Sequence, residues 1–303
     1  MKISVIIPNF NGANLLKQNL PKVLSSVEDS EIIVVDDAST DNSVNILHQY
    51  FPQVKIIAKD KTEGFSSSVN DGVRKASGDL IVLLNSDVWP NENLLKFLKP
   101  YFQDPLVFAV GCLQKSMNRE QLNKQGRGIG QFKEGFMLHG PGKYNKTNTL
   151  WVFGGAGMYR KKIWNELGGM DPIYNPFYWE DIDISYRAIK AGFKVLFEPK
   201  SIVNHEQSTG SIRSFYSPDF IKTIAYRNQI LFVWLNITDS MLVLKHIIYL
   251  PIHILRAFFA RNFPFLDGLL KALIKLPKVL RKRQLNKKLN QRTDREVLFG
   301  LGE

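Results

Sequence analysis

The sequence is poor in cysteine and in long apolar runs, and each absence excludes certain classes of site or segment. A single cysteine, Cys112, excludes an intramolecular disulfide and every zinc-ribbon or CxxC site, and it suits a reducing compartment. The apolar run from Ile3 to Ile7 is too short for the core of a signal peptide. The most apolar stretch, residues 227–256, is interrupted by charged residues and broken by Pro251, so we expect a surface-lying helix there and no membrane-spanning one.

The chain also lacks the markers of a nucleic-acid-binding protein, although it is strongly basic. Its 303 residues carry 40 Lys and Arg against 28 Asp and Glu, a net charge of +12. Residues 211–303 hold 16 of the basic residues and only 6 acidic ones, so the excess lies in the C-terminal third. Because no recognised nucleic-acid-binding module accompanies these residues, we expect no nucleic-acid partner and expect attraction to another anionic surface.

Short β-branched segments alternate with helix-period segments over the first hundred residues. Apolar residues recur at helical spacing from Leu16 to Leu24 and from Val44 to Leu47, the latter behind a potential cap at Asp41. The expected strands are Ile3–Ile7, Glu31–Val35, Val54–Ala58 and Leu80–Leu84. This order predicts an α/β fold with a doubly wound, mostly parallel sheet flanked by helices.

Polar residues follow three of these strands where each ends. They are Pro8–Gly12, Asp36–Asp41 and Asn85–Asp87. Ligands collect beyond the carboxyl ends of parallel strands, so these side chains are expected to converge. Serines follow Gly64, but no GxxxxGK[ST] motif exists, which excludes a P-loop.

The second half of the sequence is more varied. Periodicity is lost over residues 113–148, which predicts a long loop. Beyond it we expect helices at Lys162–Leu167 and at about 181–191 and a strand at Lys194–Phe197. From about Ser214 the composition changes to apolar helices that carry Lys and Arg. We therefore divide the chain into an α/β domain, 1–213, and a basic helical region, 214–303.

Five segments together resemble family two glycosyltransferases with the GT-A fold. They are Val5–Asn11, Val34–Asp41, Gly64–Phe65 leading to Asn70–Gly72, Leu83–Asp87 and Trp179–Asp183, in the order and approximate spacing of that family. The resemblance covers about residues 1–210 and is closest to the branch that includes bacterial rhamnosyltransferases, partly through Tyr226–Asn228. It implies a Rossmann-like catalytic domain with a C-terminal helical extension.

The resemblance implies a site for a nucleotide-diphosphate sugar. A carboxylate after a strand offers acceptors to a base and ribose at a fixed distance from the sheet. The residues that match the family's donor-binding segments are Pro8, Asn9, Asp36, Asp37, Gly64, Asn70, Asn85 and Ser86. The alternative for Asp36 and Asp37 is an Asx turn that caps the next helix.

A divalent cation, Mg²⁺ or Mn²⁺, is implied by the segment Asn85–Asp87, which resembles the family's DxD motif. Hard cations bind oxygen ligands and neutralise a diphosphate leaving group. Asn85 replaces the first aspartate, so Asp87 is the charged ligand and diphosphate oxygens must complete the shell. His205 matches a position where relatives offer a further ligand, although a lone histidine is more often structural.

An acid pair, Glu180–Asp181, is the candidate for proton removal. An acceptor hydroxyl must lose its proton as it attacks the sugar, so a carboxylate must lie within hydrogen-bond reach. The resemblance implies that Asp181 is the base, with Glu180 second, and the positive end of a helix should keep both ionised. Helix capping without chemistry is the alternative. For the acceptor we expect contacts with Trp179, Gly154 and Gly155.

Together these features predict a metal-dependent inverting glycosyltransferase. It would transfer a sugar from a UDP- or dTDP-sugar to a glycan or lipid-linked acceptor in cell-surface polysaccharide synthesis. The alternatives are a nucleotidyltransferase and a silent nucleotide-sugar-binding membrane protein. We expect a cytoplasmic protein at the inner membrane face, where the basic apolar helices contact anionic lipid. Packing of these helices against the catalytic domain or a partner, including a homodimer, is the other possibility.

Overall fold

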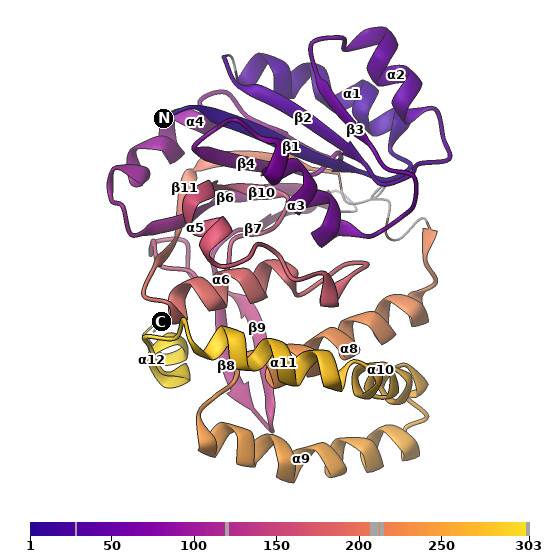
Figure 1. The fold of residues 1–303 in the computed structure, drawn as a ribbon, viewed down its shortest axis with the longest axis vertical. Helices are drawn as coiled ribbons and strands as arrows, with labels where there is room; N and C mark the ends of the chain where they lie inside the picture. The colour runs from indigo at the N-terminus through magenta and orange to yellow at the C-terminus, as the bar shows by residue number, and fades with distance from the viewer. Residues whose placement is uncertain (28, 119–120, 207–211, 213–214, 301–303) are drawn as a thin grey trace.

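A central mixed sheet carries the fold (Figure 1). The structure is a computed structural model that describes residues 1–300 except 28, 119–120, 207–211 and 213–214. Within that part of the chain the strand order is β3-β2-β1-β4-β10-β6-β11-β5, with β7 paired to β6. The strands of this sheet are β1 (Ile3–Asn9), β2 (Glu31–Asp36), β3 (Lys55–Ala58), β4 (Leu80–Leu84), β5 (Val88–Pro90), β6 (Val107–Asn118), β7 (Gln121–Gln125), β10 (Ala156–Arg160) and β11 (Lys194–His205).

The first four strands form a parallel unit, as predicted. β1 pairs with both β2 and β4, and β2 pairs with β3, all in parallel register. Successive residues of β1 point to opposite faces: Val5 and Ile7 join one buried cluster, while Ile6 joins the other. Both faces are buried because the helices between the strands cover them on either side.

The helices that cover the sheet are α1 (Ala13–Ser26), α2 (Ser43–Tyr50), α3 (Phe65–Lys75), α4 (Leu94–Leu98), α5 (Lys161–Glu166) and α6 (Glu180–Lys190), with short 3₁₀ segments η1 (Lys99–Gln103) and η2 (Pro172–Tyr174). Of these, α1, α2, α5 and α6 lie where the sequence predicts helices, whereas α3 and α4 were not predicted. The N-cap of α2 is Asn42, one residue after the expected Asp41. The Asp41 carboxylate still accepts the first helical N–H, that of Ser43, at 3.0 Å.

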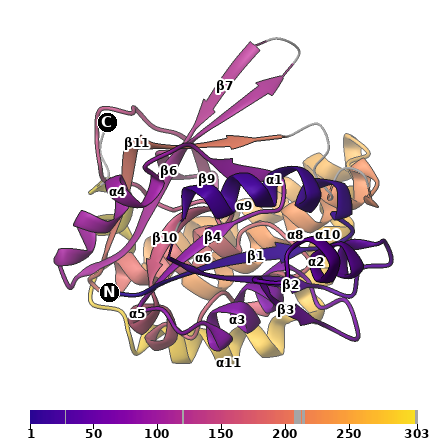
Figure 2. The same cartoon turned by 90° about the horizontal axis from the view of Figure 1, so that it is seen from above.

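The predicted loop over residues 113–148 is wrong, because most of it is extended strand. β6 continues to Asn118 and turns back as β7, and this pair projects from the body of the molecule in Figure 2. A separate hairpin follows, β8 (Gly128–Lys133) and β9 (Phe136–Pro141). Glycine, lysine and glutamine interrupt the alternation of apolar residues in these strands, so their composition was typical of a loop.

β11 is also three times longer than expected, and its length matters for the site. The sequence predicted a strand at Lys194–Phe197, but β11 runs on to His205 past an irregular step after Glu198. Its last residues pair with β5, so that His205 lies opposite Val88. This register places a late histidine beside the loop that follows β4.

The C-terminal helices pack below the sheet (Figure 1). They are α8 (Pro218–Asn236), α9 (Ser240–Phe259), α10 (Phe263–Ile274), α11 (Leu276–Lys287) and α12 (Asp294–Phe299). α12 returns to α6, where Lys190 Nζ lies 2.8 Å from the Asp294 carboxylate and both groups are buried. The boundary expected at 213/214 falls outside the described residues.

We expected Pro251 to break the helix that contains it, and this expectation is wrong. α9 is continuous for 20 residues, and by length and composition it could cross a membrane. The turn of the β8–β9 hairpin holds the helix on both sides of the proline. His246 Nδ1 lies 2.7 Å from the Gly135 carbonyl, and His253 Nε2 lies 2.9 Å from that of Glu134. These contacts keep α9 helical across the one missing N–H.

Candidate functional site

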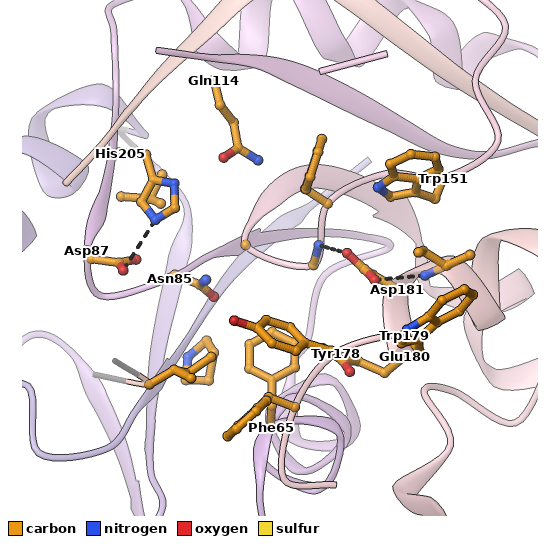
Figure 3. Close-up of a pocket in the computed structure, with 18 of the residues that line it drawn as sticks. Phe65, Asn85, Asp87, Gln114, Trp151, Tyr178, Trp179, Glu180, Asp181 and His205 are labelled. Carbon is orange, nitrogen blue, oxygen red and sulfur yellow. Dashed lines mark hydrogen bonds and ion pairs between the residues drawn. The ribbon is translucent and has the colours of Figure 1, made fainter. Parts of the chain in front are cut away.

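One cavity of about 890 Å³ lies at the carboxyl ends of β1, β2 and β4. It brings together residues that are remote in the sequence, including Asp37, Asp87 and Asp181 (Figure 3). Of the residues singled out from the sequence, those that line it are Pro8, Asn9, Asp37, Gly64, Asn85, Ser86, Asp87, Gly154, Gly155, Trp179, Glu180, Asp181 and His205. The predicted convergence of strand-end loops is therefore confirmed.

Asp87 and His205 form a pair at one end of the cavity. His205 Nε2 lies 3.3 Å from Asp87 Oδ2, which the pairing of β11 with β5 explains. Three buried polar atoms here have no hydrogen-bond partner among the described residues: Asp87 Oδ1, His205 Nδ1 and Asn85 Oδ1. Unsatisfied buried acceptors carry a free-energy penalty, so they indicate a place where a ligand completes the bonding.

A divalent cation fits this end of the cavity, with few protein ligands. A carboxylate and an imidazole are donors that Mn²⁺ accepts, and an asparagine oxygen lies beside them. The described residues contain no group of three His, Cys, Asp or Glu able to hold a metal. A cation here therefore needs oxygens from a bound nucleotide to fill its shell.

Asp181 and Glu180 lie at the opposite end, on the first turn of α6 (Figure 3). Asp181 accepts the N–H of Gly154 at 3.2 Å and of Ile182 at 2.8 Å. Burial raises the pKa of Asp181 to about 6, so this carboxylate is mostly ionised at neutral pH.

Glu180 differs from the expectation that both acids stay ionised. Burial, followed by the neighbouring Asp181 charge, raises the pKa of Glu180 well above its ordinary value. Its Oε2 has no hydrogen-bond partner within the described part of the chain. The helix end does not offset the loss of water, so the surroundings of Glu180 favour its neutral form. Burial therefore raises the pKa of both neighbouring acids, and the Asp181 charge adds to the effect at Glu180.

The loop before these acids is held by α8. Tyr178 and Trp179 both have positive φ, 73° and 75°, which bulky residues rarely adopt. Asn228 Nδ2 donates to the carbonyls of Tyr174, Phe177 and Tyr178, at 2.8, 2.9 and 2.8 Å. The Tyr226–Asn228 segment, noted in the sequence for its resemblance, therefore fixes the start of α6.

Asp37 lines the cavity, but its carboxylate already has partners. It accepts the N–H of Gly64 at 2.8 Å and of Glu63 at 3.0 Å, and Lys59 Nζ lies 3.1 Å away. Asp37 lines the cavity together with Pro8 and Asn9.

Two predicted donor-binding residues do not line the cavity. Asp36 is buried and accepts bonds from Asn9 Nδ2 at 2.8 Å and from Ser39 Oγ at 2.6 Å. Asn70 exchanges hydrogen bonds with the backbone of Met170 at 2.7 and 3.1 Å. Both side chains are used inside the protein and shape the loops of the site.

Gly155 permits a close approach between two parts of the site. A Cβ on residue 155 would overlap the side chain of Asn85, and the Asn85 N–H donates to the Gly155 carbonyl at 3.2 Å. Any larger residue here would displace Asn85. Gly155 thus contacts Asn85 near the Asp87 end of the cavity, while the N–H of Gly154 donates to Asp181 at the other end, so the glycine pair connects the two ends.

The sequence also matches a family of known proteins. The sequence model of glycosyl transferase family 2 matches residues 4–168, more than half of the chain. The chain belongs to glycosyltransferase family 2. An O-antigen chain rhamnosyltransferase of Salmonella typhimurium is 26% identical over 225 residues, covering 69% of this chain and 67% of the relative. A pre-mycofactocin glycosyltransferase of Mycobacterium tuberculosis is 26% identical over 219 residues, covering 68% of this chain and 43% of the relative.

The fold of this family 2 member agrees with solved structures. The structure of GalNAc-T7 with UDP, GalNAc and Mn²⁺ matches at a TM-score of 0.64 and 19% identity, covering 79% of this chain and 48% of that chain. This confirms the predicted GT-A fold. The chain spans about half the length of the first curated relatives that it matches.

Some residues that line the cavity of this family 2 member were not identified as site residues from the sequence. His139 comes from β9, and its ring lies 5.2 Å from both Trp151 and Trp179. Gln114 of β6 also lines the cavity, and so does Phe65 of α3, which belongs to the Gly64–Phe65 segment noted in the sequence. The β6–β9 region was assigned to a loop, so no pattern placed its residues at a site. A histidine flanked by apolar residues in Phe136–Pro141 was the available signal.

Proposed function

We propose that this protein is an inverting, metal-dependent glycosyltransferase that uses a nucleotide-diphosphate sugar. The observation that carries the proposal is the single cavity with Asp87 and His205 at one end and Asp181 at the other. Membership of glycosyltransferase family 2 supports it and disfavours a nucleotidyltransferase. The chain has both the Asp87–His205 pair and the buried Asp181, which argues against a binding protein without catalytic activity.

The donor nucleotide is proposed to lie between Asp37, which would accept hydrogen bonds from its base or ribose, and Asp87, near which its diphosphate would lie. Asn85, Asp87 and His205 would hold a Mn²⁺ or Mg²⁺ ion together with diphosphate oxygens. When bound, such an ion stabilises negative charge on a departing nucleoside diphosphate. Pro8, Asn9, Gly64 and Ser86 would line the nucleotide, while Asp36 and Asn70 keep their loops in position.

Asp181 is proposed to act as the base. Its carboxylate, ionised above pH about 6, would accept the proton of the acceptor hydroxyl as that oxygen attacks the anomeric carbon. Attack from the side opposite the leaving diphosphate inverts the configuration. Burial raises the pKa of Glu180 and so favours its neutral form, which is proposed to donate a hydrogen bond to the sugar or the acceptor. Trp179 and the Gly154–Gly155 backbone would bound the acceptor.

The acceptor is proposed to be a glycan or a lipid-linked glycan precursor of the cell surface. The O-antigen chain rhamnosyltransferase among the relatives supports this class and the rhamnosyltransferase-like branch. A UDP- or dTDP-sugar is the donor class, and the cytoplasmic side of the membrane is the proposed location. Residues 214–303 are proposed to extend the catalytic domain, since α8 supports its acid loop.

Metal-dependent nucleotide binding tests the donor end directly. Calorimetric titration with UDP and dTDP should give tighter binding when Mn²⁺ is present. Replacing Asp87→Ala should remove that gain, because it removes the one charged ligand. Asp219→Ala, an exposed aspartate on α8, is the control and should bind as the parent does. A parent protein that neither binds these nucleotides with Mn²⁺ nor transfers labelled sugar from them would refute the proposal.

A further inference from the structure

Helix α9 is apolar on two opposite faces. One face packs against the protein through Leu242, His246 and Ala257. Only 11% of its most apolar window is buried, although the mean hydropathy of that window is 1.5. A surface helix of a soluble protein normally turns a polar face outward, so the outer face of α9 needs another explanation.

The outer face of α9 is a continuous apolar strip. Its exposed large side chains are Met241, Leu244, Ile247, Ile248, Ile252, Leu255, Phe258 and Phe259. At 3.6 residues per turn these positions span an arc of about 140°. No charged residue falls within that arc, and the helix contains no Asp or Glu. Phe259 is 80% exposed and Phe258 65%, and their rings pack edge to face against each other at 5.7 Å, so together they form an exposed aromatic pair.

Helix α10 extends the strip. It follows α9 after a short turn and packs against it, and it exposes Phe263, Leu270, Leu273 and Ile274. Ile274 is 79% exposed. Figure 1 shows α9 along the edge of the molecule farthest from the β1–β4 sheet. We call the exposed side chains of α9 and α10 the apolar strip.

Basic residues border the apolar strip. On α9, Lys245 and Arg256 lie next to the apolar arc, and Arg261 follows in the turn to α10. Arg256 pairs with Glu134, but that pair is exposed and leaves the guanidinium at the surface. Lys278 and Arg281 are exposed on the following helix. Apolar side chains with a cationic border match an anionic lipid surface, with acyl chains below and headgroups at the rim.

The attachment of α9 to the hairpin determines how such a helix would meet a bilayer. Trp234 Nε1 donates to His246 Nε2 at 2.9 Å, so the His246 Nδ1–H must be the donor to the Gly135 carbonyl. Burial lowers the pKa of His246, which favours this neutral tautomer at physiological pH. The bonds of His246 and His253 hold α9 lengthwise along the surface of the catalytic domain. The helix cannot cross a membrane without breaking them.

We propose that the apolar strip docks the protein on an anionic bilayer, with α9 lying in the plane of the interface. The charge at the rim favours lipid over a second copy of the chain, because two copies would place the same cations against each other. The inference stands independently of the reaction, since it uses no residue of the cavity.

Vesicle flotation tests the docking. Purified protein is mixed with phosphatidylcholine vesicles that contain or lack phosphatidylglycerol. The parent should float with the anionic vesicles and far less with the neutral ones, and raising NaCl from about 0.1 to about 1 M should weaken binding. Arg256→Gln with Arg261→Gln should lower the partition coefficient by about fivefold per charge.

The decisive variant removes apolar groups from the exposed face only. Ile248→Ser with Leu255→Ser should reduce the partition coefficient at least tenfold. The matched control, Tyr50→Ser with Leu106→Ser, removes exposed apolar groups far from the strip and should bind as the parent does. Circular dichroism and thermal unfolding establish that each variant is folded.

Three outcomes would overturn the proposal. The Ile248/Leu255 variant could bind vesicles as tightly as the control. It could instead convert a dimeric parent into a monomer without lipid, which would make the strip an interface between copies. Resistance of vesicle-bound parent to extraction at high pH would show a spanning helix.

Discussion

Replacing Asp181→Asn should abolish sugar transfer and at the same time stabilise the fold at alkaline pH. Burial raises the pKa of Asp181 to about 6 from 3.8. An acid whose pKa is higher in the folded state makes the fold less stable at every pH where it must ionise. Asparagine has nearly the same shape and carries no charge, so it avoids this penalty while removing the base.

The magnitude follows from the two pKa values. The difference between about 6 and 3.8 corresponds to about 3 kcal/mol at pH 8, where the carboxyl is ionised in both states. The penalty shrinks as the pH falls through 6 and vanishes below 3.8. Asparagine can accept only one of the two bonds from Gly154 and Ile182, a loss of about 1–2 kcal/mol. We therefore expect a net gain of about 1–2 kcal/mol at pH 8 and no gain near pH 4.

Urea unfolding of the parent and of Asp181→Asn at both pH values measures this difference. Transfer from a labelled donor and Mn²⁺-dependent UDP binding are measured on the same samples, and binding should be retained. The reasoning about burial fails if the variant is less stable than the parent at pH 8, or if the difference does not depend on pH. Turnover near the parent's rate would remove Asp181 as the base.

Two further substitutions test how the site is held together. Gly155→Ala should weaken Mn²⁺-dependent UDP binding at least tenfold, because the added Cβ displaces Asn85. The control is Gly140→Ala, whose Cβ meets nothing within 4 Å. Equal UDP affinities in the two variants would contradict the role of the close approach between Gly155 and Asn85. Asn228→Ala removes the amide that donates to the carbonyls of Tyr174, Phe177 and Tyr178, and it should lower kcat at least tenfold with little change in donor KM, because the Tyr178–Trp179 turn relaxes. Gln229→Ala, which loses one bond to Met137, should keep the parent's kcat, and a matching kcat for Asn228→Ala would argue against positioning by α8.

The parallel half of the sheet was predictable because local and tertiary preferences agree there. β4 has the predicted bounds, and its five residues are all buried, as a continuous β-branched and leucine run suggests. The loops at strand ends then converge by topology, which is why the side chains of Asp37 and Asp87 were expected to meet. His205 was expected at the site only through the resemblance to family two glycosyltransferases, because the predicted strand ended at Phe197. Their roles in binding and catalysis stay predictions.

The antiparallel half could not be predicted, because its strands depend on partners distant in sequence. β8 and β9 carry Gly, Gln and Lys, and they are strands because they pair with each other and pack under Trp151 and α9. His139 enters the cavity only through that pairing. The raised pKa of Glu180 could not be predicted from the sequence either, since it depends on how completely its neighbours exclude water.

The ion pair between Lys190 and Asp294 makes α12 relevant to activity. The two residues are 104 positions apart, yet the ammonium at the end of α6 has the Asp294 carboxylate as its charged partner in a dry interior. A chain that stops before α12 would leave that cation with uncharged partners, the Asn236 carbonyl and the Thr238 hydroxyl. We therefore expect such a chain to hold α6, which starts with Glu180 and Asp181, less firmly and to be less active even when every cavity residue is present.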